Sequence, residues 1–255
     1  MTDTSPIPAP APAEGPITLA LDIGGTGLKA GLLDCHGDMV GAPTRVETPH
    51  PSPPEAVVPA LVGLAHCLGS FDRISVGFPG VVRGSTVMTA PNLGTDAWAG
   101  FDLGGTLKER LGRPARVLND ATVQGLGVIA GKGLECVITL GTGFGFALFQ
   151  DGRLAPHLEI SHHIASGKKT YDEYLGDAAL RNVGKKRWRK RVAKMLHQLR
   201  VVVNWDTLYI GGGNARHIDV DLPADIKIVS NKAGITGGVR LWDAKMDVDF
   251  PGTTD

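Results

Sequence analysis

The chain is short of cysteine and of net charge, and it has no long apolar run; each shortage excludes a class of protein. Its 255 residues include three cysteines, an odd number without metal-ligand spacing, so we expect neither a disulfide framework nor a structural zinc site. Lysine plus arginine number 26, as do aspartate plus glutamate, and a neutral chain has no overall field that favours nucleic acid. No apolar run approaches the roughly 20 residues of a membrane span. We expect a reduced, cytoplasmic protein with no nucleic-acid or membrane partner.

The N-terminal segment is rich in proline and alanine and lacks the basic start and apolar centre of a signal peptide. We expect residues 1–16 to form a disordered tail. The rest of the chain is long enough for one large domain or two smaller ones.

Glycine is abundant, with 35 residues, and three glycine clusters follow strand-like runs. The first cluster is Asp22-Ile-Gly-Gly-Thr-Gly-Leu-Lys29, directly after the apolar run 17–21. Its glycines let backbone N–H groups approach an anion, Thr26 adds a hydroxyl and Lys29 a positive charge. Asp22 can hold Mg²⁺ directly or through water. Taken alone, the cluster is equally typical of an ordinary β-turn.

The other two clusters strengthen the case for a phosphate site. Leu140-Gly-Thr-Gly-Phe-Gly145 separates the strand-like runs 136–140 and 146–149, and Gly211-Gly-Gly213 ends the run that starts at Asp206. The first two loops connect strand to strand, which excludes the strand–loop–helix of P-loop and dinucleotide-binding folds. Three strand-terminal glycine loops predict one phosphate or nucleotide site between two lobes.

In this order the clusters resemble the two phosphate segments and the adenosine segment of the actin-like sugar kinases. Within that superfamily the chain resembles the ROK family, above all its polyphosphate-type glucokinases, over residues 17–243. The resemblance implies an α/β, actin-like (ribonuclease H-like) fold with mixed sheets and a cleft between the lobes. We expect a small lobe over 17–114, a large lobe over 115–230, and a closing helix plus tail over 231–255. The donor-binding residues that it implies are Asp22, Gly24, Gly25, Thr26, Lys29, Gly141, Thr142, Gly143, Gly145, Gly211, Gly212 and Gly213.

The segment 115–120 is a predicted strand that ends in Asn119 and Asp120, and a helical pattern follows over 121–130. Phosphoryl transfer to a hydroxyl needs a carboxylate that accepts the proton, and strand ends are common ligand sites in open α/β sheets. The alternative is that Asp120 caps the helix. The Asn-Asp pair of the family implies that Asp120 is the catalytic base, a role that is compatible with capping.

Two further segments resemble the sugar-binding loops of the family. One is Pro91-Asn-Leu-Gly94, in which a turn asparagine is the alternative. The other is Glu159-Ile-Ser-His162, where the family has Glu-x-Gly-His, so we expect Ser161 to strain the loop and to weaken sugar affinity more than chemistry. The sugar-binding residues that the resemblance implies are Asn92, Asn119, Asp120, Glu159 and His162.

Residues 167–194 concentrate ten lysines and arginines in an otherwise neutral chain. No cysteine follows Cys136, so the zinc segment of many ROK proteins is absent. A run of this kind is usually a solvated helix face, and a nucleic-acid patch would need more aromatic residues than Trp188. The third interpretation is a track for a long polyanion, because both side chains form charge-assisted bonds to phosphate. Its candidates are Lys168, Lys169, Lys185, Lys186 and Arg187.

The residues and the resemblance together predict a glucokinase. It would transfer a phosphoryl group from polyphosphate, ATP or both to the 6-hydroxyl of glucose, with Mg²⁺ as cofactor and Asp120 as general base. The alternatives are an ATP-only kinase of another hexose and a catalytically weak sugar-binding protein. The repressors of the family need a helix-turn-helix ahead of the kinase-like part, for which sixteen residues are too few. A homodimer is implied by the family alone.

Overall fold

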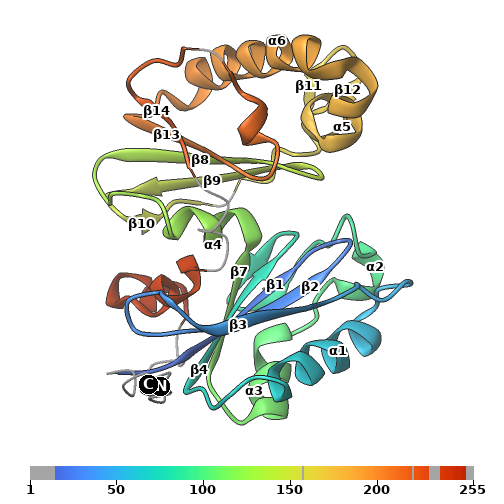
Figure 1. Cartoon of the computed structure of the whole chain (residues 1–255), viewed down its shortest axis with the longest axis vertical. Helices are drawn as coiled ribbons and strands as arrows, with labels where there is room; N and C mark the ends of the chain where they lie inside the picture. The colour runs from blue at the N-terminus through green and yellow to red at the C-terminus, as the bar shows by residue number, and fades with distance from the viewer. Residues whose placement is uncertain (1–14, 157, 220, 230–235, 251–255) are drawn as a thin grey trace, which may run out of the picture.

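The computed structural model describes residues 15–156, 158–219, 221–229 and 236–250, which form two lobes (Figure 1). The tail expected over 1–16 lies outside these ranges except for its last two residues, and so does the start of the expected closing segment. Within the described part of the chain, none of the helices combines the length and apolar character needed to cross a membrane.

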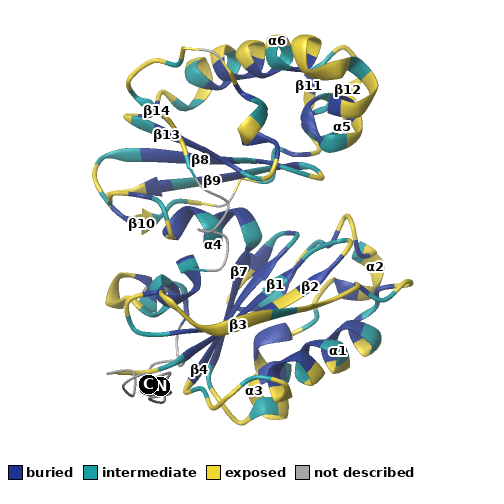
Figure 2. Ribbon diagram, viewed as in Figure 1, coloured by how far each residue is buried: buried dark blue, intermediate teal, exposed yellow. Residues whose placement is uncertain are grey.

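The lower lobe in Figure 1 is built on a mixed five-stranded sheet of order β3-β2-β1-β4-β7. Its strands are β1 (Thr18–Ile23), β2 (Leu28–Leu33), β3 (Met39–Val46), β4 (Arg73–Phe78) and β7 (Ala115–Asn119). β1, β2 and β3 form an antiparallel meander, whereas β4 and β7 continue the sheet in parallel with β1. Figure 2 shows that the central strands are buried, while the edge strand β3 is exposed along most of its length.

The boundary expected at residue 115 is wrong for the strand that follows it. β7 pairs with β4 through five residues, all buried, and is therefore an edge strand of the lower sheet. Each residue of β7 pairs with one 41 positions earlier in the sequence (115 − 74 = 41), which no local pattern indicates. The lobes meet instead at α4 (Asp120–Leu126), which contacts β4 and β7 below and β8 and β9 above.

The upper lobe is built on a second five-stranded sheet of order β10-β9-β8-β13-β14. Its strands are β8 (Leu134–Leu140), β9 (Phe144–Gln150), β10 (Arg153–Leu154), β13 (Thr207–Gly211) and β14 (Ile226–Ile228). The turn from β9 to β10 is Asp151-Gly152, with φ of 52° and 75°, the pair of positive values that a type I′ hairpin requires.

Helices cover the outer side of each sheet (Figure 1). They are α1 (Pro54–His66), α2 (Thr95–Trp98) and α3 (Leu103–Leu111) in the lower lobe, and α5 (Tyr171–Leu175) and α6 (Asp177–Val203) in the upper lobe. α6 is two helical segments joined at Gly184, whose φ of 73° and ψ of 158° are not helical. Backbone of that kind is essentially restricted to glycine, so the residue type sets the break.

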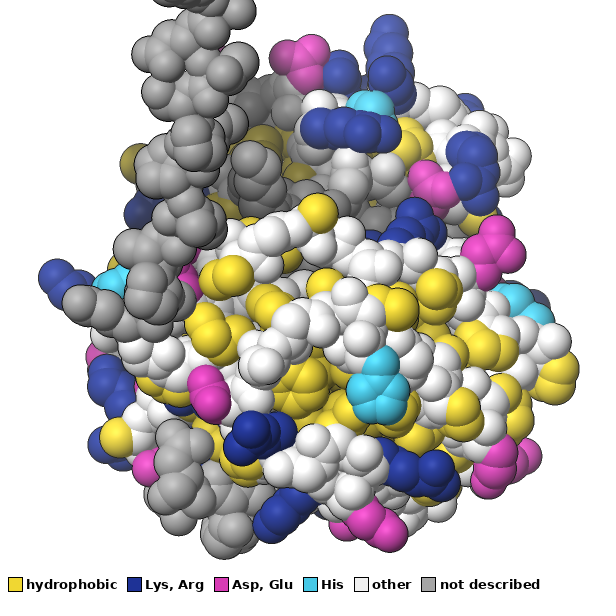
Figure 3. All heavy atoms as spheres, turned by 60° about the horizontal axis from the view of Figure 1, so that its bottom comes forward, with side chains coloured by type: hydrophobic (Ala, Val, Ile, Leu, Met, Phe, Trp, Pro, Cys, Tyr) yellow, Lys and Arg dark blue, Asp and Glu magenta, His cyan; other side chains and the backbone are white. Residues whose placement is uncertain are grey.

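Short elements complete the fold. They are the hairpins β5–β6 (Val82–Arg83, Thr86–Val87) and β11–β12 (Ile164–Ser166, Lys169–Thr170), and the 3₁₀ helices η1 (Ala215–His217), η2 (Gly237–Trp242) and η3 (Ala244–Asp249). On the outer face of the lower lobe, charged side chains of both signs are scattered among apolar and uncharged ones (Figure 3).

The chain returns to the lower lobe through η2, in the region where we expected a closing helix. The Ser75 hydroxyl donates to the Gly238 carbonyl at 2.6 Å, and the Trp242 indole N–H donates to that hydroxyl at 2.9 Å. The described part is a 3₁₀ helix rather than an α-helix, and the consecutive glycines at its start lower the α-helical propensity.

Candidate active site

A cleft of about 480 Å³ lies between the lobes and is lined by parts of all three glycine clusters. Of the expected donor-binding residues, Gly211 alone does not line it, because this glycine is a buried part of β13. The expected sugar-binding residues also reach it: Asn92, Asn119, Asp120, Glu159 and His162. Segments that are far apart in the sequence therefore meet at one cavity.

The first glycine loop is a tight turn between β1 and β2. The Gly24 N–H donates to the Gly27 carbonyl at 3.0 Å, and the Thr48 hydroxyl fixes the Gly24 carbonyl at 2.6 Å. The Lys29 ammonium lies 2.8 Å from Asp22 Oδ2, so the two charges at the loop compensate each other. The loop thus presents backbone N–H groups beside a cation, as a phosphate site requires.

The second and third glycine clusters are fastened to each other. The Gly141 carbonyl accepts bonds from the Asp177 N–H at 2.9 Å and from Asn214 Nδ2 at 3.2 Å. Gly212 has a φ of 85°, and a Cβ on it would lie 2.3 Å from the Leu140 carbonyl oxygen. Glycine is therefore required there both by the backbone conformation and by space, and the two loops form one wall of the cleft.

Asp120 stands at the first turn of α4, where it is half-buried on the cleft floor. The alternative that Asp120 caps α4 is wrong. Asn119 is the cap, and its Oδ1 accepts from the N–H groups of Ala121 and Thr122 at 3.0 and 3.2 Å. Asn119 Nδ2 also donates to the Gly80 carbonyl at 3.2 Å. Asn119 is therefore tied into the protein and positions its neighbour, while Asp120 points its carboxyl at the cleft.

The surroundings raise the pKa of the Asp120 carboxyl from 3.8 to about 7. Desolvation is the largest cause, the negative charge of Asp22 is the next, and Glu159 contributes in the same direction, against a 2.8 Å bond from the Ala121 N–H. A carboxylate with a pKa near neutrality is a strong enough base to accept a proton, and a substantial fraction of it is ionised at neutral pH.

The sugar-side loop differs from our expectation at Ser161. The φ angle of Ser161 is not positive. The expectation that loss of glycine strains the backbone at this position is therefore wrong. The hydroxyl of Ser161 instead donates to Glu159 Oε1, which also accepts from the Ser161 N–H at 3.3 Å.

On the opposite side, a Cβ on Gly25 would lie 3.6 Å from Asn92 Cβ, so Asn92 borders the first glycine loop.

Three polar residues of the cleft escaped the sequence analysis: Gln124, Thr139 and Asp172. Asp172 Oδ1 accepts from the Phe144 N–H at 2.6 Å, and desolvation raises the pKa of this carboxyl. Thr170 and Glu173 form a capping box, which marks the start of α5. The contact of Asp172 with the second glycine loop, however, joins residues distant in sequence, so no local pattern indicates it. Gln124 lies four residues after Asp120 on α4, a spacing that places both on one helix face.

None of the five proposed track residues lines the cleft. Lys168 and Lys169 lie at the β11–β12 hairpin, and the other three begin the second segment of α6. All five are exposed, and within the described ranges none of them forms an ion pair. Trp188 is buried and donates to the Leu175 carbonyl at 2.7 Å, so it offers no stacking platform.

Asp22 is the residue whose chemistry fits a magnesium ion. Across the described residues, no group of three or more His, Cys, Asp or Glu is arranged to hold a metal by itself. Mg²⁺ is, however, commonly held by one or two carboxylates together with substrate phosphates and water. Asp22, which lines the cleft and accepts from Lys29 through Oδ2, matches that requirement once a donor supplies the remaining ligands.

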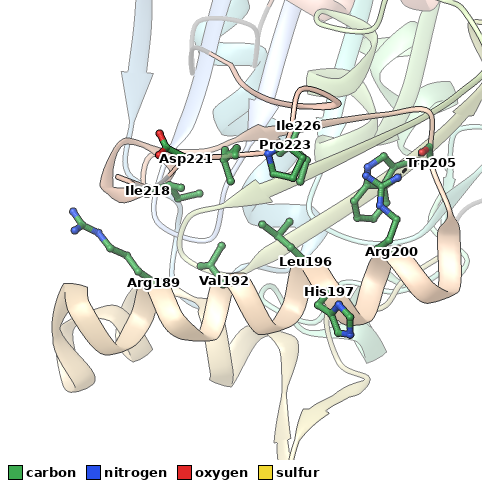
Figure 4. Close-up of a pocket in the computed structure, with 12 residues that line it drawn as sticks. Arg189, Val192, Leu196, His197, Arg200, Trp205, Ile218, Asp221, Pro223 and Ile226 are labelled. Atoms are coloured by element: carbon green, nitrogen blue, oxygen red, sulfur yellow. Dashed lines mark hydrogen bonds between the residues drawn. The ribbon is translucent and has the colours of Figure 1, made fainter.

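A second cavity, of about 320 Å³, lies between α6 and the segment 205–226 (Figure 4). Its walls are mostly apolar and include Val192, Leu196 and Ile226. Arg200 at its edge is already stacked 4.0 Å from the centre of the Trp205 ring and bonds the Trp205 carbonyl. Since no glycine loop borders this cavity, it lacks the features needed for phosphoryl transfer.

Comparisons with known proteins agree with this geometry. The model of the ROK family matches residues 18–159. A polyphosphate glucokinase of Mycobacterium tuberculosis (strain ATCC 25618 / H37Rv) is 32% identical over 258 residues, covering 93% of this chain and 96% of that protein. An inorganic polyphosphate/ATP-glucomannokinase from Arthrobacter sp. strain KM has a similar structure, with a TM-score of 0.80, 29% identity, and coverage of 89% of this chain and 98% of the other. A ROK family glucokinase from Streptomyces griseus shares the fold at a TM-score of 0.73 and 20% identity, covering 88% of this chain and 98% of its own.

Proposed function

The chain belongs to the ROK family, and we propose that it is a glucokinase that uses polyphosphate and ATP as phosphoryl donors. The observation that carries the proposal is the position of Asp120, a carboxyl with a pKa near 7 on the floor of a cleft bordered by three glycine clusters. The expected α/β sugar-kinase fold is confirmed by the structural relatives. Similarity to a polyphosphate glucokinase and to a polyphosphate/ATP-glucomannokinase supports both donors.

The reaction follows from the groups at the cleft. Asp120 accepts the proton of the 6-hydroxyl while the hydroxyl oxygen forms its bond to the terminal phosphorus of the donor and the bridging P–O bond breaks. Asn119 keeps Asp120 in place by capping α4. Asn92, Glu159 and His162 orient the sugar by hydrogen bonds to its other hydroxyls.

In this proposal the glycine loops and Lys29 bind the phosphates of the donor. Backbone N–H groups of the first two loops bond phosphate oxygens without the steric cost of side chains, and the third cluster borders the adenosine when ATP is the donor. Asp22 would hold Mg²⁺, which would supply positive charge to the donor phosphates. Closure of the lobes around the sugar excludes water and prevents hydrolysis of the donor.

The exposed cations at the β11–β12 hairpin and on α6 form the track for a long donor in this proposal. Among the described residues none of them has an acidic partner, which supports the proposal, since their charge is available for phosphate. The proposal places the protein in the cytoplasm as a homodimer, as the resemblance to the family implies.

The test is the formation of glucose 6-phosphate with Mg²⁺ and either ATP or long-chain polyphosphate. We expect product with both donors, and we expect Asp120→Asn to lower kcat by at least about 10²–10⁴-fold, the usual contribution of a general base. The dissociation constant for glucose should change little, because the amide keeps the shape of the carboxyl. Mannose is tested as a second acceptor, because one structural relative is a glucomannokinase.

The donor track is tested separately by the triple variant K185E/K186E/R187E. It should raise the KM for polyphosphate and leave the KM for ATP unchanged. Activity with ATP alone in the wild type would reject the polyphosphate part of the proposal, and absence of product with both donors and both sugars would reject the kinase.

A further inference from the structure

A row of three charged side chains crosses the lower sheet from the cleft to its edge. Asp22 on β1 is the direct partner of Lys29 on β2, and Lys29 is the direct partner of Arg45 on β3. Directly opposed residues of antiparallel strands project from the same face. Because Asp22 and Lys29 line the cleft, Arg45 lies on the cleft side of the sheet, at the outer end of the row.

The Arg45 guanidinium rests against the first glycine loop. A Cβ on Gly27 would lie 2.6 Å from Arg45 Nε and 2.7 Å from Nη2. Gly27 does not have a positive φ, so its backbone conformation does not demand glycine. The missing side chain instead provides the space that the guanidinium fills.

Among the described residues, Arg45 has no ion-pair partner of opposite charge. Lys29 is paired with Asp22 at 2.8 Å, whereas Arg45 is exposed and forms no ion pair or hydrogen bond with any other described residue. Two cations directly opposite each other destabilise a sheet. A bound anion at this end of the loop would remove that cost.

The row begins at the reacting end of the site. Gly77 on β4 is the partner of Asp22, and a Cβ on Gly77 would lie 3.4 Å from the Cα of Asp120. Three strand spacings of about 4.8 Å each separate Gly77 from Arg45, or about 14 Å in all. Asp22 and Lys29 lie between Gly77 and Arg45 in this row, so we place a phosphate bound by Arg45 farther from Asp120 than one bound by Lys29.

We propose that Arg45 binds a phosphate of the donor beyond the transferred one, as a bidentate partner at the mouth of the first glycine loop. The inference rests on the proposed function. The planar guanidinium supplies two parallel N–H groups to one phosphate. Gly27 is a positioning residue, because it lets the guanidinium approach the loop.

The steady-state test compares Arg45→Gln and Arg45→Lys with Arg110→Gln, which removes an exposed arginine of α3 on the lower lobe. Loss of a hydrogen bond to a charged group weakens binding by about 10- to 100-fold, so Arg45→Gln should raise the donor KM by that factor. The KM for glucose and kcat at saturating donor should stay within about twofold. Arg45→Lys should raise the donor KM by less than Arg45→Gln, since lysine keeps the positive charge and lacks only the paired N–H groups of the guanidinium.

A double-mutant cycle with Gly27→Ala tests the contact itself. The added methyl group must displace the guanidinium, so Gly27→Ala alone should raise the donor KM. In the Arg45→Gln background the same change should have little further effect, because the group that it displaces is gone. Equal effects of Gly27→Ala in both backgrounds would contradict the inference.

Calorimetric binding of tripolyphosphate separates this inference from the proposed function. The wild type should bind it at least about tenfold more tightly than Arg45→Gln, whether or not the protein turns over. Equal affinities, or an Arg45→Gln variant with an unchanged donor KM, would overturn the role of Arg45 and leave the kinase proposal standing. A wild type that binds tripolyphosphate through Arg45 but makes no sugar phosphate would reject the kinase and keep the anion site.

Discussion

At the scale of single residues, two carboxyl groups of the cleft have different neighbours. Asp22 forms an ion pair with the Lys29 ammonium at 2.8 Å. Asp120 is desolvated and lies near the negative charges of Asp22 and Glu159, which favour its protonated form. In the proposed function these different surroundings separate the carboxyl group that would hold the donor and its metal from the one that would accept the proton.

The raised pKa of Asp120 predicts how activity depends on pH. The base acts in its ionised form, so kcat/KM for glucose should fall about tenfold per pH unit below a midpoint near 7. Donor phosphates also titrate, and Glu159→Gln distinguishes the two causes. This variant removes a charge that raises the pKa of Asp120, so the midpoint should move to lower pH. A midpoint that is identical in the variant would assign the profile to the donor.

The hydroxyl of Ser161 occupies an oxygen of Glu159, so its removal should improve sugar binding. We expect Ser161→Gly to lower the KM for glucose by about 2- to 10-fold, the worth of one hydrogen bond, with kcat nearly unchanged. Ser161→Ala is the matched control, because it removes the hydroxyl and keeps Cβ. The two variants should behave alike, and a gain in Ser161→Gly alone would restore the backbone-strain explanation that the structure contradicts.

At the scale of elements, the predictions from sequence succeeded where local chemistry decides the structure. The β1–β2 and β8–β9 connections are strand–turn–strand because their glycines and flanking apolar runs specify it. The placement of β7 and the contact of Asp172 with the second glycine loop depend on partners distant in sequence. α6 combines both cases. Its helical pattern is local, whereas the break at Gly184 becomes evident only from the backbone angles of that residue.

The break in α6 predicts opposite effects of two glycine-to-alanine changes. At both Gly184 and Gly63 an added Cβ would meet no atom within 4 Å. Gly184 has a φ of 73°, so Gly184→Ala should reduce the free energy of unfolding by about 1–3 kcal/mol. Gly63 is inside α1, so Gly63→Ala should increase it by about 0.5–1 kcal/mol. Urea denaturation measures both, and a loss of stability at both sites would show that backbone conformation is not the cause.

At the scale of the whole molecule, Arg116 joins the end of the chain to the lower sheet. Its side chain is buried, donates to the Leu241 carbonyl at 2.6 Å and to Asp247 at 2.8 Å, and lies between the rings of Trp242 and Phe250. η2, which it helps to hold, also contacts α4 between the two lobes. One buried arginine thus supports the segment that links the lower sheet to the cleft floor.

Replacement of Arg116 should therefore destabilise the molecule as a unit. We expect Arg116→Leu to lower the free energy of unfolding by about 1–3 kcal/mol, since it removes the donor to the carbonyl of buried Leu241. Arg110→Leu, at an exposed position of α3, should change it by less than about 0.5 kcal/mol. Urea unfolding with an unchanged slope would assign the effect to the native state. Similar small effects of both changes would show that the C-terminal segment does not depend on Arg116.

The sequence by itself determined the glycine loops, the strands that lead into them, the Asn-Asp pair before α4 and the family resemblance. These depend on residue type and on spacing along the chain, through turn chemistry and apolar periodicity. Only the tertiary structure decided that β7 belongs to the lower sheet, that Asn119 rather than Asp120 caps α4, and that Arg45 lies against Gly27. Each of these depends on which backbone or side-chain groups are left to pair once the sheets have formed, and that is set by long-range packing.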